Sequence, residues 1–185
     1  MKKIAIYGRK GGILKSTLAT NLAYGFSKIG RTLLVDLDSQ NDSSLYLSVS
    51  KDQYRKTFDD LFDKRQNIGV EDTIIEAREN LYILPNNELE AVEVLFQSAS
   101  RLDKILDNKF KHIENFFDYI VFDTAPTRSK ISDSVLLYAD NVILPVQMLG
   151  GSGVRSIANV YSVISDLFLD TNIIKAVIPT FLDST

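Results

Sequence analysis

The chain has 185 residues, of which 45% are hydrophobic and 24% are charged, a composition typical of one globular domain around a single core. Acidic residues outnumber basic ones by 24 to 21, giving a net charge of −3. This balance argues against a strongly basic nucleic-acid-binding domain. Because the chain has no cysteine, a disulfide framework, a cysteine-ligated zinc site and a thiol nucleophile are excluded.

The N-terminal segment does not have the pattern of an export signal. Its apolar run over Ile4–Tyr7 is broken by glycines and basic residues before it reaches the length of a signal sequence. No other stretch approaches the roughly 20 apolar residues of a membrane-spanning helix, and no terminal amphipathic helix suggests a surface anchor. We therefore expect a cytoplasmic protein with no membrane partner.

Short apolar runs alternate with longer segments of helical periodicity, which is typical of βαβ units around a parallel sheet. The predicted strands are Ile4–Tyr7, Thr32–Val35, Leu81–Leu84, Tyr119–Phe122, Val142–Val146 and Ile173–Ile178. Apolar stripes at helical spacing predict core-facing helices over residues 18–29, 89–106 and 154–167. Residues 41–79 are more polar, and we expect them to form an excursion with weak helical pieces around Thr57–Lys64 and Glu71–Arg78. The sequence therefore predicts an α/β fold in one domain.

The strongest site signal is the run Lys-Gly-Gly-Ile-Leu-Lys-Ser-Thr at residues 10–17, between the first predicted strand and the first predicted helix. A phosphate-binding loop needs inward backbone N–H groups, a helix N-terminus, a lysine against the phosphate charge and a hydroxyl for Mg²⁺. The residues of these types are Gly11, Gly12, Lys15 and Ser16. The run therefore predicts a phosphate-binding loop.

The loop departs from the usual pattern Gly-x4-Gly-Lys-Ser/Thr, because Arg9 and Leu14 stand at the two glycine positions. It nevertheless resembles the deviant Walker A loop of the ParA/MinD ATPases. That resemblance implies nucleotide binding by Gly11, Gly12, Ile13, Leu14, Lys15, Ser16 and Thr17. It also implies that Lys10 reaches the nucleotide of the partner subunit in a sandwich dimer. Leu14 replaces a family glycine, and its branched side chain puts nucleotide binding in doubt. A negative φ at this position would let leucine be tolerated, and on that basis we expect a competent loop.

A second segment, Leu33–Gln40, resembles the strand signature of the same family, in which two alternate aspartates precede Pro-Gln; here Ser39 replaces the proline. A spacing of two residues places the carboxylates of Asp36 and Asp38 on one side of the strand end. The resemblance implies that Asp38 positions or activates the attacking water. It further implies that Asp36 supports Mg²⁺ and the neighbouring switch segment.

A third segment, Phe117–Pro126, resembles the Walker B strand. The resemblance implies that Asp123, at the end of this strand, holds Mg²⁺ through water together with the Ser16 hydroxyl, since this hard cation prefers oxygen ligands. Farther along, Ala139–Gln147 resembles the next strand of the family, and Val177–Asp183 resembles the segment that approaches the adenine. The resemblance thus covers nearly the whole chain.

Taken as a member of this family, the chain is expected to have a three-layer P-loop NTPase fold, with a mostly parallel twisted sheet and helices on both faces. The resemblance implies a Mg²⁺-ATP-dependent dimerising ATPase that acts in plasmid or chromosome partitioning. Its implied partners are a second copy, a centromere-binding ParB-like adaptor and non-specific DNA, with nucleoid association if DNA binding is retained. Residues 1–185 would form one P-loop ATPase domain without the C-terminal helices of full-length members.

Other interpretations stay open beside these. The lysine and serine of the loop could begin an ordinary surface helix, and the aspartates could simply end strands. A degenerate ATPase, disabled by Leu14, would act as a nucleotide-independent dimerisation or regulatory protein. Arg128 and Lys130 are either a dimer or DNA contact or, as we expect, solvated loop charge. The run Gly150–Gly153 is interpreted as a connection rather than a second phosphate loop, and His112 as a structural or surface residue.

Overall fold

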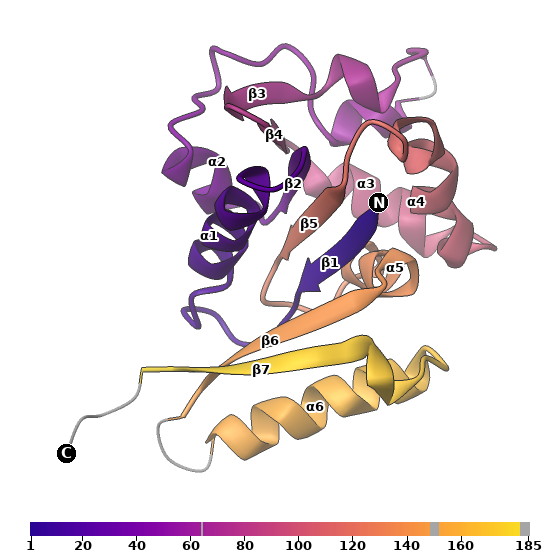
Figure 1. The fold of residues 1–185 in the computed structure, drawn as a ribbon. Coiled ribbons are helices and arrows are strands. Elements are labelled where there is room, and N and C mark those ends of the chain that lie inside the picture. Colours follow the sequence, from indigo (N-terminus) through magenta and orange to yellow (C-terminus); the bar gives the residue numbers. More distant parts are fainter. Residues whose placement is uncertain (64, 149–151, 182–185) are drawn as a thin grey trace.

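The computed structural model describes residues 1–63, 65–148 and 152–181. Over these residues the chain forms a seven-stranded sheet with the order β3-β4-β2-β5-β1-β6-β7 (Figure 1). The strands are β1 (Lys2–Ile6), β2 (Thr32–Leu37), β3 (Ile75–Arg78), β4 (Leu81–Leu84), β5 (Tyr119–Thr124), β6 (Asn141–Gln147) and β7 (Ile174–Thr180). The pairing is parallel except between β3 and β4, which confirms the predicted α/β fold.

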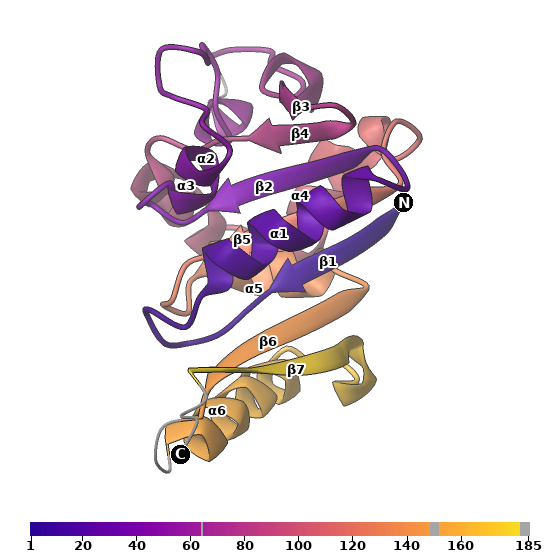
Figure 2. The same cartoon turned by 60° about the vertical axis from the view of Figure 1, so that its left-hand side comes forward.

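Helices cover both faces of the sheet, so the molecule has three layers (Figures 1 and 2). The α-helices are α1 (Lys15–Ser27), α2 (Asp42–Tyr46), α3 (Leu89–Gln97), α4 (Leu102–Phe110), α5 (Lys130–Tyr138) and α6 (Ser152–Asp166). Short 3₁₀ turns lie at Asp59–Phe62, Val70–Asp72, Lys111–Ile113 and Thr171–Ile173. No helix within the described ranges is both long and apolar enough to span a membrane.

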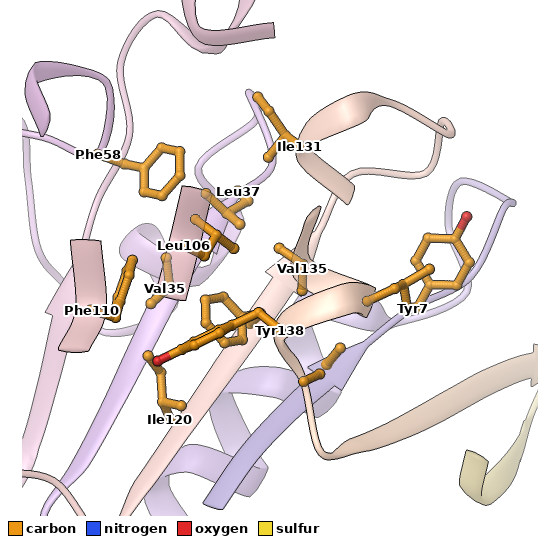
Figure 3. Close-up of a cluster of buried hydrophobic side chains, with 14 of the residues drawn as sticks. Tyr7, Val35, Leu37, Phe58, Leu106, Phe110, Ile120, Ile131, Val135 and Tyr138 are labelled. Carbon is orange, nitrogen blue, oxygen red and sulfur yellow. The ribbon is translucent and has the colours of Figure 1, made fainter. Parts of the chain in front are cut away.

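The core is divided between the two faces because successive strand residues point to opposite sides. On one face, Ile4 and Ile6 of β1 pack in a cluster with Ala19 and Ala23 of α1. On the other face, a larger cluster joins β1, β2 and β5 to helices α3–α6. Its aromatic centre, in Figure 3, includes Phe110, whose ring centroid lies 6.0 Å from those of the neighbouring rings Phe122 and Tyr138.

Two predicted elements were wrong. The helix expected over residues 89–106 is two helices, α3 and α4, that break at Ser98–Arg101. Serine favours helix ends over helix interiors, and the apolar stripe continues because both helices pack on the same core. The helical piece expected at Glu71–Arg78 is present only in the 3₁₀ turn Val70–Asp72, and its second half is strand β3, which pairs antiparallel with β4. Asn80 takes a left-handed φ of 58° between them, a conformation that asparagine tolerates.

The structure also corrects three smaller expectations. Helix α5 was not predicted as an element, although it packs in the core. Two apolar residues assigned to core-facing stripes are on the surface: Ile29 lies beyond the end of α1 and is 71% exposed, and Val154, in the first turn of α6, is 74% exposed. The weak helical piece at Thr57–Lys64 is present only as the 3₁₀ turn Asp59–Phe62.

Replacing the buried Phe110 should test this account of the core. We expect Phe110→Ala to lower the free energy of unfolding by about 3–5 kcal/mol, because it leaves a cavity among close-packed rings. The matched control is Phe168→Ala, since Phe168 is 96% exposed; its effect should stay within about 0.5 kcal/mol. Urea denaturation measures both, and equal effects of the two variants would contradict the account.

Candidate functional site

The candidate site lies at the carboxyl edge of the sheet, where strands β1, β2 and β5 end side by side. Asp123 of β5 is in register with Ile6 of β1 and with Asp36 of β2. Because the three strands are parallel, the segments that follow them leave from the same edge (Figure 2). In open α/β sheets this edge is where ligands bind. The predicted loop and the predicted aspartates are therefore brought together.

The segment between β1 and α1 has the shape expected of a phosphate-binding loop. Ile13 is buried and anchors the loop to the core, and a Cβ on Gly8 would lie 2.6 Å from its Cδ1 atom. Gly12 takes a left-handed φ of 71°, and Gly11 and Gly12 both face open space. No side chain in the described parts of the chain caps the start of α1, so its first N–H groups remain available to an anion.

Leu14, the residue just before α1, does not meet the condition under which it was expected to be tolerated. Its φ is 66° and its ψ is 30°, in the left-handed region, so the negative φ is absent. A left-handed conformation costs a residue with a Cβ about 1–2 kcal/mol. The side chain is 43% exposed. The loop thus keeps the backbone shape that glycine would adopt freely, and leucine holds it under strain.

The two loop lysines are held at the mouth of the site. Lys15 is buried, and its Nζ donates a hydrogen bond to the Lys10 carbonyl at 3.2 Å. Burial lowers the pKa of Lys15, while the charges of Asp123 and Asp38 act in the opposite direction. The Lys10 ammonium donates to Gln147 at the end of β6. Both cations therefore rest on neutral acceptors of this chain and are free to be drawn toward an anion.

Asp123 is fully buried at the end of β5. Its Oδ2 accepts a hydrogen bond from Ser43 Oγ at 2.7 Å, while its Oδ1 has no partner among the described residues. Burial raises the pKa of Asp123 to about 6, and the nearby hydroxyls of Ser43 and Ser16 partly offset this effect. An unpartnered buried carboxylate oxygen beside a hydroxyl is an unfavourable arrangement unless something binds there.

Asp36 is equally buried, but its side chain has a structural task. One carboxylate oxygen, Oδ2, accepts hydrogen bonds from the backbone N–H and the hydroxyl of Ser44, at 3.0 and 2.9 Å. Burial, and then the charge of Asp123, raise the pKa of Asp36 to about 7. Asp36 therefore fastens α2 to the strand end, and its oxygens are less available to a cation than those of Asp123.

The donor set at this edge fits Mg²⁺ as an ion that is held partly by the protein. Within the described residues no group of three or more acidic, histidine or cysteine side chains could hold a metal ion by itself. Mg²⁺ commonly binds through one or two protein oxygens and completes its shell with water and substrate phosphates. The free oxygen of Asp123 and the Ser16 hydroxyl suit that role.

Asp38 stands half-buried just beyond the end of β2, where its Oδ1 accepts a hydrogen bond from the Gln40 backbone N–H at 3.1 Å. A residue that sequence reasoning missed, Asn86, holds this region in place. Asn86 is fully buried, and its Nδ2 donates to the carbonyls of Asp36 and Asp38 at 3.1 and 2.9 Å. The sequence signal that could have indicated Asn86 is its position: a polar residue that follows the buried strand β4 and Pro85.

Arg128, expected to be solvated, instead forms ion pairs within the chain. Its guanidinium contacts Asp133 at 3.0 Å and Asp166 at 2.7 Å, joining the start of α5 to the end of α6. Lys130 is exposed and His112 lies on the surface turn after α4. Residues 150 and 151 of the glycine-rich run and residues 182 and 183 of the expected adenine segment lie outside the described residues.

Comparison with known proteins gives consistent matches. The AAA domain family model AAA_31 matches residues 1–174. An uncharacterised protein of Methanocaldococcus jannaschii is 31% identical over 80% of this chain and 59% of its own length. The sporulation initiation inhibitor protein Soj of Bacillus subtilis is 29% identical over 99% of this chain and 74% of its own length. Several other curated relatives are matched over about half of their length.

Among solved structures, a plasmid partition protein of Borrelia burgdorferi bound to AMPPNP is 27% identical, with a TM-score of 0.83. The match covers 100% of this chain and 76% of that chain. The predicted three-layer P-loop fold is thereby confirmed.

The buried carboxyl groups predict a pH dependence in the absence of metal. Because the folded-state pKa values of Asp36 and Asp123 lie above 3.8, folding disfavours their charged forms. Their contribution therefore lowers stability as the pH rises from about 4 to about 7. We expect Asp123→Asn to be more stable than wild type at pH 7 and to lose less stability over this range. Urea denaturation in EDTA at several pH values measures this, and identical slopes would contradict it.

Proposed function

We propose that this chain, which belongs to the ParA/MinD-type AAA-domain family of P-loop ATPases, binds Mg²⁺-ATP at its deviant Walker A loop and hydrolyses it as a dimerising switch. One observation carries the proposal: groups that suit a cation and groups that suit a phosphate lie at the same edge of the sheet. They are the Asp123 oxygen that has no partner among the described residues, the buried Lys15 and the open loop glycines. A cation and a phosphate group would together satisfy these groups.

In the proposed complex the loop N–H groups and the start of α1 surround the phosphates. Lys15 exchanges the Lys10 carbonyl for a phosphate oxygen, which provides a stronger, charge-assisted contact. Asp123 and Ser16 hold Mg²⁺, which when bound neutralises charge on the phosphate oxygens. Catalysis then depends on positioning and electrostatic stabilisation, as is general for phosphoryl transfer.

The hydrolytic step is assigned to Asp38. Its carboxylate orients a water molecule for in-line attack on the terminal phosphorus, and the bond to the leaving ADP oxygen breaks as inorganic phosphate forms. The backbone of Asp38 is fixed by Asn86, so the carboxylate starts from a defined position. Lys10 of a second copy would contact the nucleotide across the dimer interface, after its ammonium leaves Gln147.

The biological output is proposed from family membership. The Borrelia burgdorferi plasmid partition protein and the match to a ParA family protein of Mycoplasma pneumoniae support a role in plasmid or chromosome partitioning. The partners proposed on that basis are a second copy of this chain, a ParB-like adaptor and non-specific DNA, in the cytoplasm or on the nucleoid.

A second candidate function is favoured by Leu14. Its left-handed φ of 66° places a branched side chain where the family has glycine, on the loop that would surround the phosphates. In this alternative the protein is a degenerate ATPase that dimerises or regulates without nucleotide. Nucleotide affinity distinguishes the two functions, because only the switch requires binding.

Replacing Lys15 tests the binding site. We expect Lys15→Ala to weaken Mg²⁺-ATP binding by at least about 100-fold, in line with the loss of a buried, charge-assisted contact, while the fold is retained. Titration calorimetry and circular dichroism measure the two properties. Lys28→Ala, at the other end of the same helix, is the control and should bind as wild type. Equal affinities of both variants would refute the assignment of Lys15.

Replacing Asp38 tests the hydrolytic step separately. We expect Asp38→Ala to bind Mg²⁺-ATP but to hydrolyse it at least about 100-fold more slowly, a loss typical of a removed water-orienting group. The ATP-bound dimer should therefore accumulate. Phosphate release and light scattering during size-exclusion chromatography report on these effects, with Asp42→Ala as the neighbouring control. Hydrolysis by Asp38→Ala at the wild-type rate would remove Asp38 from the mechanism.

A further inference from the structure

The segment 86–93 contacts two separate parts of the candidate site. Its first contact is with the end of β2, where pairing with β4 has stopped. Strand β4 pairs with β2 only as far as Leu84 with Val35, so the carbonyls of Asp36 and Asp38 extend beyond it. The side chain of Asn86 supplies the hydrogen bonds that β4 does not make there, because its Nδ2 donates to both carbonyls. A fully buried amide in this position fixes the end of β2 without blocking the carboxylates that follow.

The second contact is made by Glu93, one turn into α3. Its Oε1 accepts from the backbone N–H of Lys130 at 2.7 Å, and its Oε2 accepts from that of Ile131 at 3.0 Å. These are the first two N–H groups of α5, and the next one, on Ser132, is bound by the Ser129 hydroxyl. A carboxylate is favoured at a helix N-terminus by both hydrogen bonding and the helix dipole.

Glu93 therefore fixes the loop that follows the Walker B strand. Only residues 125–129 separate the end of β5 at Thr124 from the start of α5, so holding the first turn of α5 also limits the positions that this loop can take. A cavity of about 260 Å³ borders the loop. Its lining includes Leu37 at the end of β2, Ser39 after it, Glu93 of α3, and Ala125 and Thr127 of the loop.

From these contacts we infer that residues 86–93 form a rigid bridge between the end of β2 and the start of α5, and that Glu93 is a positioning residue for hydrolysis. The inference rests on the proposed function in assigning Asp38 to the hydrolytic step. Glu93 has both carboxylate oxygens on the α5 backbone, so it acts through the loop and not on the nucleotide. A shift of α5 is transmitted through α3 and Asn86 to the backbone of Asp38.

Amide hydrogen exchange tests the bridge without any nucleotide. In Glu93→Ala we expect exchange at Lys130 and Ile131 to quicken by about tenfold or more, since two charge-assisted hydrogen bonds are lost. The distinctive expectation concerns Gln40 and Asn41, whose N–H groups bind Asp38; their exchange should also quicken. Glu93→Gln keeps one of the two acceptors and should show a smaller change at the same four amides.

The control is Glu90→Gln, which removes the same charge from the exposed side of α3 at the same cavity. It should leave all four amides unchanged, and the amides of β1 should be unchanged in every variant. Faster exchange at Lys130 and Ile131 without a change at Gln40 and Asn41 would reduce Glu93 to a local helix cap and overturn the bridge. An equal effect of Glu90→Gln would also overturn it.

Kinetics test the positioning role. For Glu93→Ala we expect kcat for ATP hydrolysis to fall by about tenfold or more while KM changes by less than about twofold, the pattern of a contact needed for the reaction and not for binding. Glu93→Gln should recover part of the rate. An unchanged kcat would refute the positioning role. A wild-type protein that does not hydrolyse ATP would refute the proposed function instead, while the exchange experiment would still decide the bridge.

Discussion

The structure depends most on two buried carboxyl groups that end neighbouring strands. Asp36 and Asp123 lie in register and are both inaccessible to water, so each charge must be compensated or suppressed. The Asp36 carboxylate accepts two hydrogen bonds from Ser44, which partly compensate for its burial and hold α2 against the sheet. Among the residues that the structure describes, Asp123 keeps one oxygen without a partner, and the nearby ammonium of Lys15 is the opposing charge. A cation bound at Asp123 would complete this arrangement.

At the same edge of the sheet, the loop before α1 has a backbone conformation that its own residue disfavours. At Leu14 the chain adopts a left-handed conformation that leucine disfavours. The buried Ile13 before it and the start of α1 after it hold the ends of this turn in place. Tertiary packing therefore imposes the loop shape, and the strain is concentrated beside the proposed phosphate-binding positions; strained residues are commonly found at functional sites.

Much of this could be predicted from the sequence because its signals are local. The strands around β5, the loop glycines and the spacing of Asp36 and Asp38 are visible as patterns, and the structure brings those residues together. The break between α3 and α4 was missed because one continuous apolar stripe serves both helices. The roles of Asn86 and Glu93 depend on contacts with residues 48 and 37 positions away, and no local pattern reports such contacts. The pairing of Arg128 with Asp166 was hidden for the same reason.

The most direct test of the central claim is the affinity of this protein for Mg²⁺-ATP, measured by calorimetry beside a Leu14→Gly variant. The account predicts micromolar binding by the wild-type chain, because its loop already has the required backbone shape. It also predicts that the glycine variant binds at least as tightly, because the strain is relieved. Binding by Leu14→Gly together with no binding by the wild type would contradict the account. The fold would then be that of an ATPase, and leucine would have disabled the switch.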